Sequence, residues 1–165
     1  MPLVDALLPE FDHEMTRTRK VLERVPDDKR DWKPHPKSFS LFALATHVAG
    51  LPNWGSETLN RSELDVGGTP PLTLLPTTRE ILAAFDRNVA DARAALTGKT
   101  DAELAAMWSL KHNGRTLFSM PKATVWRSFV VSHLIHHRAQ LTVYLRLLDI
   151  PVPAIYGPSA DEPAF

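Results

Sequence analysis

Two features are missing from this chain of 165 residues: cysteine and an excess of charge of either sign. Without cysteine the protein forms no disulfide bond and has no thiol nucleophile or thiolate metal ligand, so thiol chemistry would need a thiol from another molecule. The 19 basic and 19 acidic residues cancel. A neutral chain without a basic stripe is not expected to bind nucleic acid or an anionic membrane surface.

Long apolar segments are also missing. No uninterrupted apolar run approaches the ~20 residues that a membrane-spanning helix needs. The first residues, Met1 to Asp5, lack the basic and apolar regions of a signal peptide. We therefore expect a cytoplasmic protein. Hydrophobic residues make up 44% of the chain, and its length suits one domain, residues 1–165, with a core that needs no disulfide or metal.

Apolar residues at helical spacing predict four long helices. Their expected ranges are about 3–25, 40–59, 77–96 and 121–148, with Ser38 as an alternative start of the second. Pro52 falls inside the second helix, where we expect a kink and not a stop. Thr77 and Glu80 form a capping-box pattern at the start of the third helix. Pro121 suits the first position of the last helix.

Between the third and last helices the sequence predicts a short helix near 100–107 and a β-hairpin. Apolar residues alternate along 107–112 and 115–120, on either side of Asn113-Gly114, a pair typical of a two-residue turn. The expected fold is therefore all-α: a four-helix bundle with a small β-hairpin insertion before the last helix.

His133 and His137 lie four residues apart in the predicted last helix. This spacing places two imidazoles one turn apart on one helix face, where both can bind the same divalent ion. With Trp126, Phe129, Gln140 and Tyr144 they fall in a stripe about 80° wide, so we expect them to face the bundle interior. Buried imidazoles are costly unless they are hydrogen-bonded or coordinated.

His47 is the third candidate ligand. It lies on the predicted second helix, with Leu44, Leu51 and Trp54 at helical steps around it. Three histidines from two helices would fill three positions of a metal's coordination shell and leave at least one open. The alternative is that an His-x-x-x-His pair arises by chance in a chain with seven histidines and binds no metal.

The other histidines are interpreted differently. His136 lies at the side of the stripe, and we expect it to have a structural role or to contact a ligand residue. His13, next to Glu14, is expected to be solvated or to cap the first helix. His35, in a proline-flanked loop, and His112, beside the hairpin turn, are expected at the surface.

Several polar residues near the candidate ligands are candidates for roles in chemistry. Gln140 and Tyr144 could orient a substrate, or they could be hydrogen-bonded core residues. Tyr156, in the proline-rich tail, could close over the pocket. Glu57 lies roughly 80° from His47 around the second helix, so we assign it no role as a base.

The sequence resembles the DinB-like (damage-inducible, YfiT-like) family of metal-binding four-helix bundles. The matching segments are Trp32-Lys33-Pro34, Ser38-Phe39-Ser40-Leu41, Leu44-Ala45-Thr46-His47 and, most specifically, His133-Leu134-Ile135-His136-His137-Arg138-Ala139-Gln140. The resemblance covers essentially the whole chain. It implies that His47, His133 and His137 are the ligands of a divalent metal ion, with zinc and nickel among the candidates. Ala139 stands where glycine is common in the family.

The resemblance also implies a metal-dependent enzyme that acts on a small molecule. Some relatives transfer low-molecular-weight thiols, which favours a thiol S-transferase over a hydrolase. A bound ion would activate the thiol in the first case and a water molecule in the second. The alternative is a non-catalytic stress-response protein that binds a metal or a small molecule. Bundles with an exposed apolar helix face often pair, so we expect a homodimer.

Overall fold

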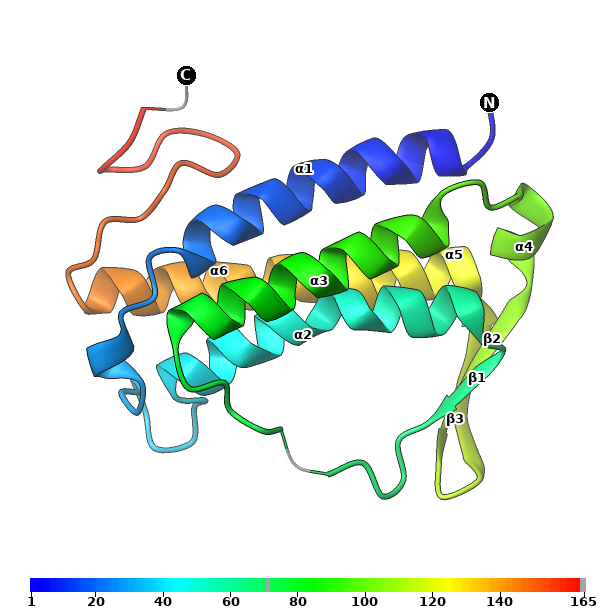
Figure 1. The fold of residues 1–165 in the computed structure, drawn as a ribbon, viewed down its shortest axis with the longest axis horizontal. Helices are drawn as coiled ribbons and strands as arrows, with labels where there is room; N and C mark the ends of the chain where they lie inside the picture. The colour runs from blue at the N-terminus through cyan, green and yellow to red at the C-terminus, as the bar shows by residue number, and fades with distance from the viewer. Residues whose placement is uncertain (71, 164–165) are drawn as a thin grey trace.

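In the computed structural model, which describes residues 1–70 and 72–163, four long helical segments lie side by side (Figure 1). The elements follow one another as α1 (Val4–Leu22), η1 (Asp27–Lys29), α2 (Leu41–Asn60), β1 (Glu63–Asp65), α3 (Thr78–Leu96), α4 (Asp101–Ala105), β2 (Met107–His112), β3 (Arg115–Pro121), α5 (Lys122–Val125), η2 (Trp126–Ser132) and α6 (His133–Leu147). The fourth helical segment is continuous from α5 through η2 to α6. The expected four-helix bundle is confirmed.

The helices form a closed arrangement in which α1 and α2 each contact both α3 and α6. Phe11 of α1, Phe42 of α2 and Phe85 of α3 are almost completely buried between them. Trp126 is also buried, and its ring centroid lies 5.0 Å from that of Phe11. Each such side chain contributes about 1.5–3 kcal/mol by its burial. Within the described residues, no helix combines the length and the apolar character needed to cross a membrane.

Side-chain caps determine where two of the long helices begin. The Ser40 hydroxyl accepts a hydrogen bond of 3.3 Å from the backbone N–H of Ala43, so α2 starts after Ser40 and not after Ser38. The Thr77 hydroxyl accepts from the backbone N–H of Glu80 at 3.2 Å, as the sequence pattern predicts. α2 then continues through Pro52 without ending.

The end of the first helix differs from the expectation. α1 ends at Leu22, three residues before Val25, because the chain tightens into i→i+3 hydrogen bonds at that point. The backbone N–H of Arg24 donates to the carbonyl of Val21 at 3.1 Å, and that of Val25 donates to Leu22 at 3.2 Å.

The predicted hairpin is present as β2 and β3, which pair antiparallel with a bulge between Leu110 and Lys111. Asn113 and Gly114 both have positive φ angles, 50° and 78°, as a two-residue hairpin turn requires. A third strand, β1, was not expected. It lies in the connector between α2 and α3 and pairs in parallel with β2, so the sheet order is β1-β2-β3.

Asp65, at the end of β1, connects this strand to the hairpin turn. Its carboxylate accepts hydrogen bonds from the backbone N–H groups of Gly67, Asn113 and Gly114, at 2.7–2.9 Å. These bonds lower the pKa of Asp65 because they stabilise the ionised form. Asp65 therefore fixes the start of the connector after β1 against the hairpin turn, at the end of the bundle.

The start of the last helix also differs from the expectation. Pro121 ends β3 and is the N-cap of α5, instead of the first helical residue. Residues Trp126–Ser132 then form a π-helical segment, whose wider i→i+5 turns are frequent at functional sites. This segment changes the helical register between Trp126 and His133. The α-helical spacing from which the histidine stripe is predicted therefore holds only from His133 onward.

Candidate metal centre

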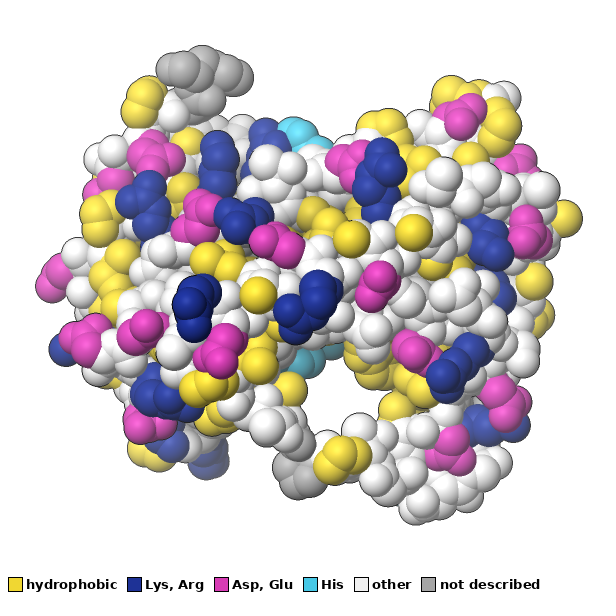
Figure 2. Space-filling model, viewed as in Figure 1, with side chains coloured by type: hydrophobic (Ala, Val, Ile, Leu, Met, Phe, Trp, Pro, Cys, Tyr) yellow, Lys and Arg dark blue, Asp and Glu magenta, His cyan; other side chains and the backbone are white. Residues whose placement is uncertain are grey.

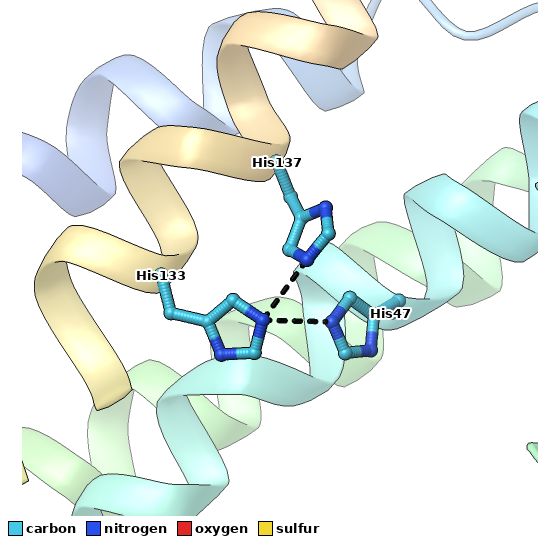
Figure 3. A group of neighbouring side chains, drawn as sticks. All are labelled: His47, His133 and His137. Carbon is cyan, nitrogen blue, oxygen red and sulfur yellow. Dashed lines mark hydrogen bonds between the residues drawn. The ribbon is translucent and has the colours of Figure 1, made fainter. Parts of the chain in front are cut away.

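His47 of α2 and the pair His133 and His137 of α6 point their imidazole rings toward one another (Figure 3). The Nε2 atom of His133 lies 3.4 Å from that of His47 and 2.9 Å from that of His137. One nitrogen from each ring lies within 4.8 Å of the other two. The three residues predicted from the sequence are thus brought together between two helices.

Local structure places each ring. His133 is the first residue of α6, directly after the π-helical segment, and His137 follows one α-helical turn later on the same face. On α2, the buried residues Leu44, Val48 and Leu51 hold the helix against the core and leave His47, which is half-buried, beside α6.

The outer sides of the two α6 imidazoles are engaged by hydrogen bonds. His137 Nδ1 lies 2.7 Å from Oε1 of Gln140, whose own Nε2 lies 3.2 Å from Nε2 of His136. His133 hydrogen-bonds to the backbone of Phe129. An oxygen beside Nδ1 of His137 accepts from a proton on that nitrogen, which leaves the lone pair of this ring on Nε2, toward the centre.

Burial favours the neutral form of all three rings. Desolvation, together with the neighbouring His137 and His133, lowers the pKa of His47 to about 4. Desolvation and the neighbouring His137 also lower the pKa of His133, although the hydrogen bond to Phe129 opposes this shift. The pKa of His137 is lowered by desolvation, against the effect of the bond to Gln140. Neutral imidazoles are the form that binds metal ions.

The spacing of the three rings suits a cation between them. The Nε2 atoms of His133 and His137 lie 2.9 Å apart, a contact that is held by a proton on one of the two nitrogens or by a cation that both nitrogens bind. An ion at 2.0–2.1 Å from each nitrogen would hold pairs of ligands about 2.9–3.4 Å apart, depending on the coordination angle. The observed separations of 2.9 and 3.4 Å fit that range. The three side chains therefore fit a divalent metal ion.

The loop before α2 covers one side of the three histidines. The Phe39 ring centroid lies 5.9 Å from that of His47 and 6.5 Å from that of His137. The Tyr144 hydroxyl donates to the carbonyl of Phe39 at 3.2 Å, and its ring packs edge-on against Trp32. Tyr144 is therefore the hydrogen-bonded core residue of the two alternatives considered for it.

Two hollows reach the histidine group. One, of about 240 Å³, is lined by Lys37, Ser38, Phe39, His137, Gln140 and Tyr144. The other is lined by Ser128, Phe129, Ser132, His133 and His136. Figure 2 shows an opening between the bundle and the connector that follows β1, with histidine side chains in cyan at its edge. A small molecule can therefore reach this part of the protein.

The remaining sequence-based interpretations have mixed outcomes. His13, His35 and His112 are exposed, as expected. Tyr156 does not lie over the three histidines, because its hydroxyl accepts a hydrogen bond from Arg138 of α6 and donates one to Glu14 of α1. Two further residues follow the expectation: the ring centroid of His136 lies 4.8 Å from that of the candidate ligand His137, and Trp126 lies in the core. Glu57 pairs with Arg61.

A buried ion pair next to the site was not predicted from the sequence. Arg138, which follows His137, lies 2.7 Å from a carboxylate oxygen of Glu14, and the two side chains are only 2% and 7% exposed. Arg138 also donates to the carbonyl of Glu14 and to the hydroxyl of Thr18, both at 3.2 Å. The sequence signal for this ion pair is that an arginine and a glutamate fall on helix faces that otherwise carry core residues.

A helical bundle in which three imidazoles converge belongs to the class of proteins that can bind a metal ion between two helices. The sequence profile of the DinB family matches residues 2–164. This chain belongs to the DinB family.

Known proteins agree with this assignment. The chain is 26% identical to the uncharacterised protein YrdA of Bacillus subtilis strain 168, over 96% of this chain and 91% of YrdA. A solved DinB-like protein from Bacillus cereus ATCC 10987 matches with a TM-score of 0.71 and 21% identity, covering 92% of this chain and 97% of that one. The DinB-like YjoA of Bacillus subtilis matches with a TM-score of 0.66 and 16% identity, covering 88% and 95%. These structures support the fold.

Proposed function

We propose that this protein is a divalent-metal-dependent enzyme in which His47, His133 and His137 bind the ion and a small molecule is the substrate. The observation that carries this proposal is the convergence of the three imidazoles: one nitrogen of each ring lies within 4.8 Å of the other two, and two of the Nε2 separations are 2.9 and 3.4 Å. Histidine ligands suit zinc and nickel, the two ions that we favour. Three protein ligands leave a coordination position open, as is typical of catalytic ions.

When bound, the ion would lower the pKa of a thiol or a water molecule that occupies the open position. The chain itself prepares the site for this chemistry. Gln140 orients the ring of His137 through its hydrogen bond, and the ring of Phe39 lies beside those of His47 and His137. Because the chain has no cysteine, a reacting thiol would be a diffusible cosubstrate.

Thiol transfer is our first candidate, and hydrolysis by an activated water molecule is the second. A non-catalytic metal-binding or small-molecule-binding role in stress is the alternative to both. We also propose a homodimer, which light scattering of the purified protein would test, and location in the cytoplasm.

Metal content tests the site directly. The protein is purified without a histidine tag, and the bound metal is measured by mass spectrometry. We expect His47→Ala and His133→Ala each to abolish stoichiometric metal, while His112→Ala, an exposed histidine, retains it. The helical circular-dichroism spectrum should be nearly unchanged in all three variants. Full metal content in both site variants would contradict the proposal.

Reaction panels distinguish the candidate activities. The metal-loaded protein is incubated with thiols and electrophiles in one series, and with esters and amides in another. Metal-dependent loss of the electrophile only when a thiol is present supports the transferase. Metal-dependent cleavage without a thiol supports the hydrolase. No turnover in either series, with metal still bound, supports the non-catalytic alternative.

A further inference from the structure

The two hollows that reach the histidine group differ in charge. Lys37 is the one basic side chain, apart from histidine, that lines either hollow, and no carboxylate lines them. Among residues 1–70 and 72–163, Lys37 forms no ion pair. Its positive charge is therefore not balanced by a nearby side chain of the described protein.

The chain holds Lys37 at this rim through its backbone. The N–H of Lys37 lies 3.2 Å from Nδ1 of His35, and the N–H of Ser38 donates to the carbonyl of His35 at 2.9 Å. The next residue, Phe39, is fixed by the Tyr144 hydroxyl. The turn is thus ordered on both sides of Lys37, an exposed residue that lines the same hollow as His137.

Other polar groups of the same hollow are already committed. Gln140 uses its oxygen for His137 and its nitrogen for His136, and the Tyr144 hydroxyl donates to a backbone carbonyl. These groups hold the site together. The ammonium group of Lys37 and the hydroxyl of Ser38 remain as the groups that can bind a ligand.

A divalent ion would add two positive charges to this environment. Imidazole binds a metal ion in its neutral form, so the three ligands would not offset this charge. An anionic ligand would balance this charge, whereas a cationic one would be repelled by both the ion and Lys37.

We infer that Lys37 selects a ligand that carries an anionic group, such as a carboxylate, in addition to the atom that approaches the histidine site. This inference rests on the proposed function, since it concerns the thiol or substrate of the same site. Lys37 is the specificity-determining residue: it contacts the anionic group and takes no part in bond making.

A series of matched thiols tests this inference. The protein is loaded with Co²⁺, whose thiolate complexes absorb light, and titrated with 3-mercaptopropionate, 3-mercaptopropionamide and 2-aminoethanethiol. These ligands share a thiol and a two-carbon spacer but carry negative, neutral and positive groups. Each dissociation constant is calculated from the concentration of the thiolate form of the ligand. The constant for each ligand is then compared between the wild type and Lys37→Met, so that differences in intrinsic affinity among the ligands cancel.

We expect Lys37→Met to weaken binding of 3-mercaptopropionate about threefold to fivefold at low salt, as a single solvent-exposed charge pair predicts. Binding of the amide should not change, and 2-aminoethanethiol should bind more tightly. Lys37→Arg should preserve the wild-type order, and added salt should reduce the effect. Lys20→Met, the same charge change at an exposed position of α1, is the matched control and should change none of the constants.

The outcomes separate the two proposals. Thiolate absorbance with all three ligands, but equal effects of Lys37→Met on each, would overturn the inference and leave the metal site intact. Equal effects of Lys37→Met and Lys20→Met would also overturn it. Absence of thiolate absorbance with every ligand in the Co²⁺-loaded wild type would instead contradict thiol activation, and the role of Lys37 would fall with it.

Discussion

His47 and His133 are separated by 86 positions in the chain, yet their Nε2 atoms lie 3.4 Å apart. The first belongs to α2 and the second begins α6, directly after a π-helical segment. The contact exists because these two helices pack side by side in the bundle. This contact adds His47 to the pair His133 and His137 of α6, so that three histidines form the site.

The hydrogen bond from His137 to Gln140 should contribute to metal affinity. Replacing Gln140 by Leu removes the acceptor at 2.7 Å from Nδ1, so the ring loses its fixed tautomer and orientation. We expect the affinity for Zn²⁺ or Ni²⁺ to fall roughly 10- to 100-fold, as is usual for the partner of a ligating histidine. Competition with a chelating dye measures this change.

Gln140→Glu and His136→Ala are the comparisons for this variant. The glutamate retains an acceptor for His137, and His136 contacts only the far end of Gln140, so both should keep affinity closer to that of the wild type. Unchanged affinity in Gln140→Leu would mean that packing alone orients His137.

The stability of the metal-free protein should depend on the protonation of His47. Its pKa is lowered to about 4 in the folded protein, against about 6.5 in an unfolded chain. Between these values the unfolded chain binds more protons. The contribution of neutral His47 is therefore fully present above about pH 6.5 and is lost as the pH falls toward about 4.

Urea unfolding of the metal-free protein at several pH values measures this dependence. His47→Asn should show a smaller loss of unfolding free energy between about pH 7 and about pH 4.5 than the wild type. His112→Asn, at an exposed position, should follow the wild type. Identical pH slopes for His47→Asn and the wild type would show that His47 protonation is not coupled to folding.

The buried pair Arg138–Glu14 should be important for stability. Replacing Arg138 by Met leaves Glu14 buried without its partner, which costs about 3–5 kcal/mol in comparable cases. The double variant Glu14→Leu with Arg138→Met removes both charges and should recover part of the loss. Urea denaturation gives the free energies of unfolding.

The surface pair Arg93–Asp12 provides the control, since it also joins two helical segments but both side chains are largely exposed. Arg93→Met should cost at most about 1 kcal/mol. If Arg138→Met costs no more than Arg93→Met, the buried pair does not stabilise the bundle beyond a surface contact.

Two glycines of α2 should respond in opposite directions to replacement by alanine. A Cβ atom at Gly55 would lie 2.7 Å from Cζ3 of the buried Trp126 and 3.3 Å from Ala92, so Gly55→Ala should destabilise the protein by about 1–3 kcal/mol. A Cβ at Gly50 meets no atom within 4 Å. Gly50→Ala should stabilise the protein by up to about 1 kcal/mol through helix propensity.

Thermal unfolding of the two variants measures these effects on one helix. Equal shifts in Tm for both would show that the close approach of Gly55 to Trp126 does not constrain the packing of α2. Metal content should stay unchanged in Gly50→Ala, although this residue lies one turn from His47.

Much of the fold and the site could be predicted because the signals are local. The four-residue spacing of His133 and His137, the Thr77 cap and the Asn113-Gly114 turn each depend on contacts within a few residues. The placement of His47 on an apolar helix face also follows from periodicity. The helical position made His47 a candidate for the third ligand, and the family resemblance implied that it joins His133 and His137.

The tertiary structure decided the features that depend on distant segments. β1 is a strand because β2, more than 40 residues later, provides its hydrogen-bond partners. Arg138 is buried because Glu14 meets it across the bundle, and Tyr156 binds this pair instead of covering the histidines. Local preferences are set by backbone sterics and neighbouring side chains, so the sequence determined the helices, caps and turn. Burial and pairing depend on which surfaces meet after the helices pack, so only the folded chain determined them.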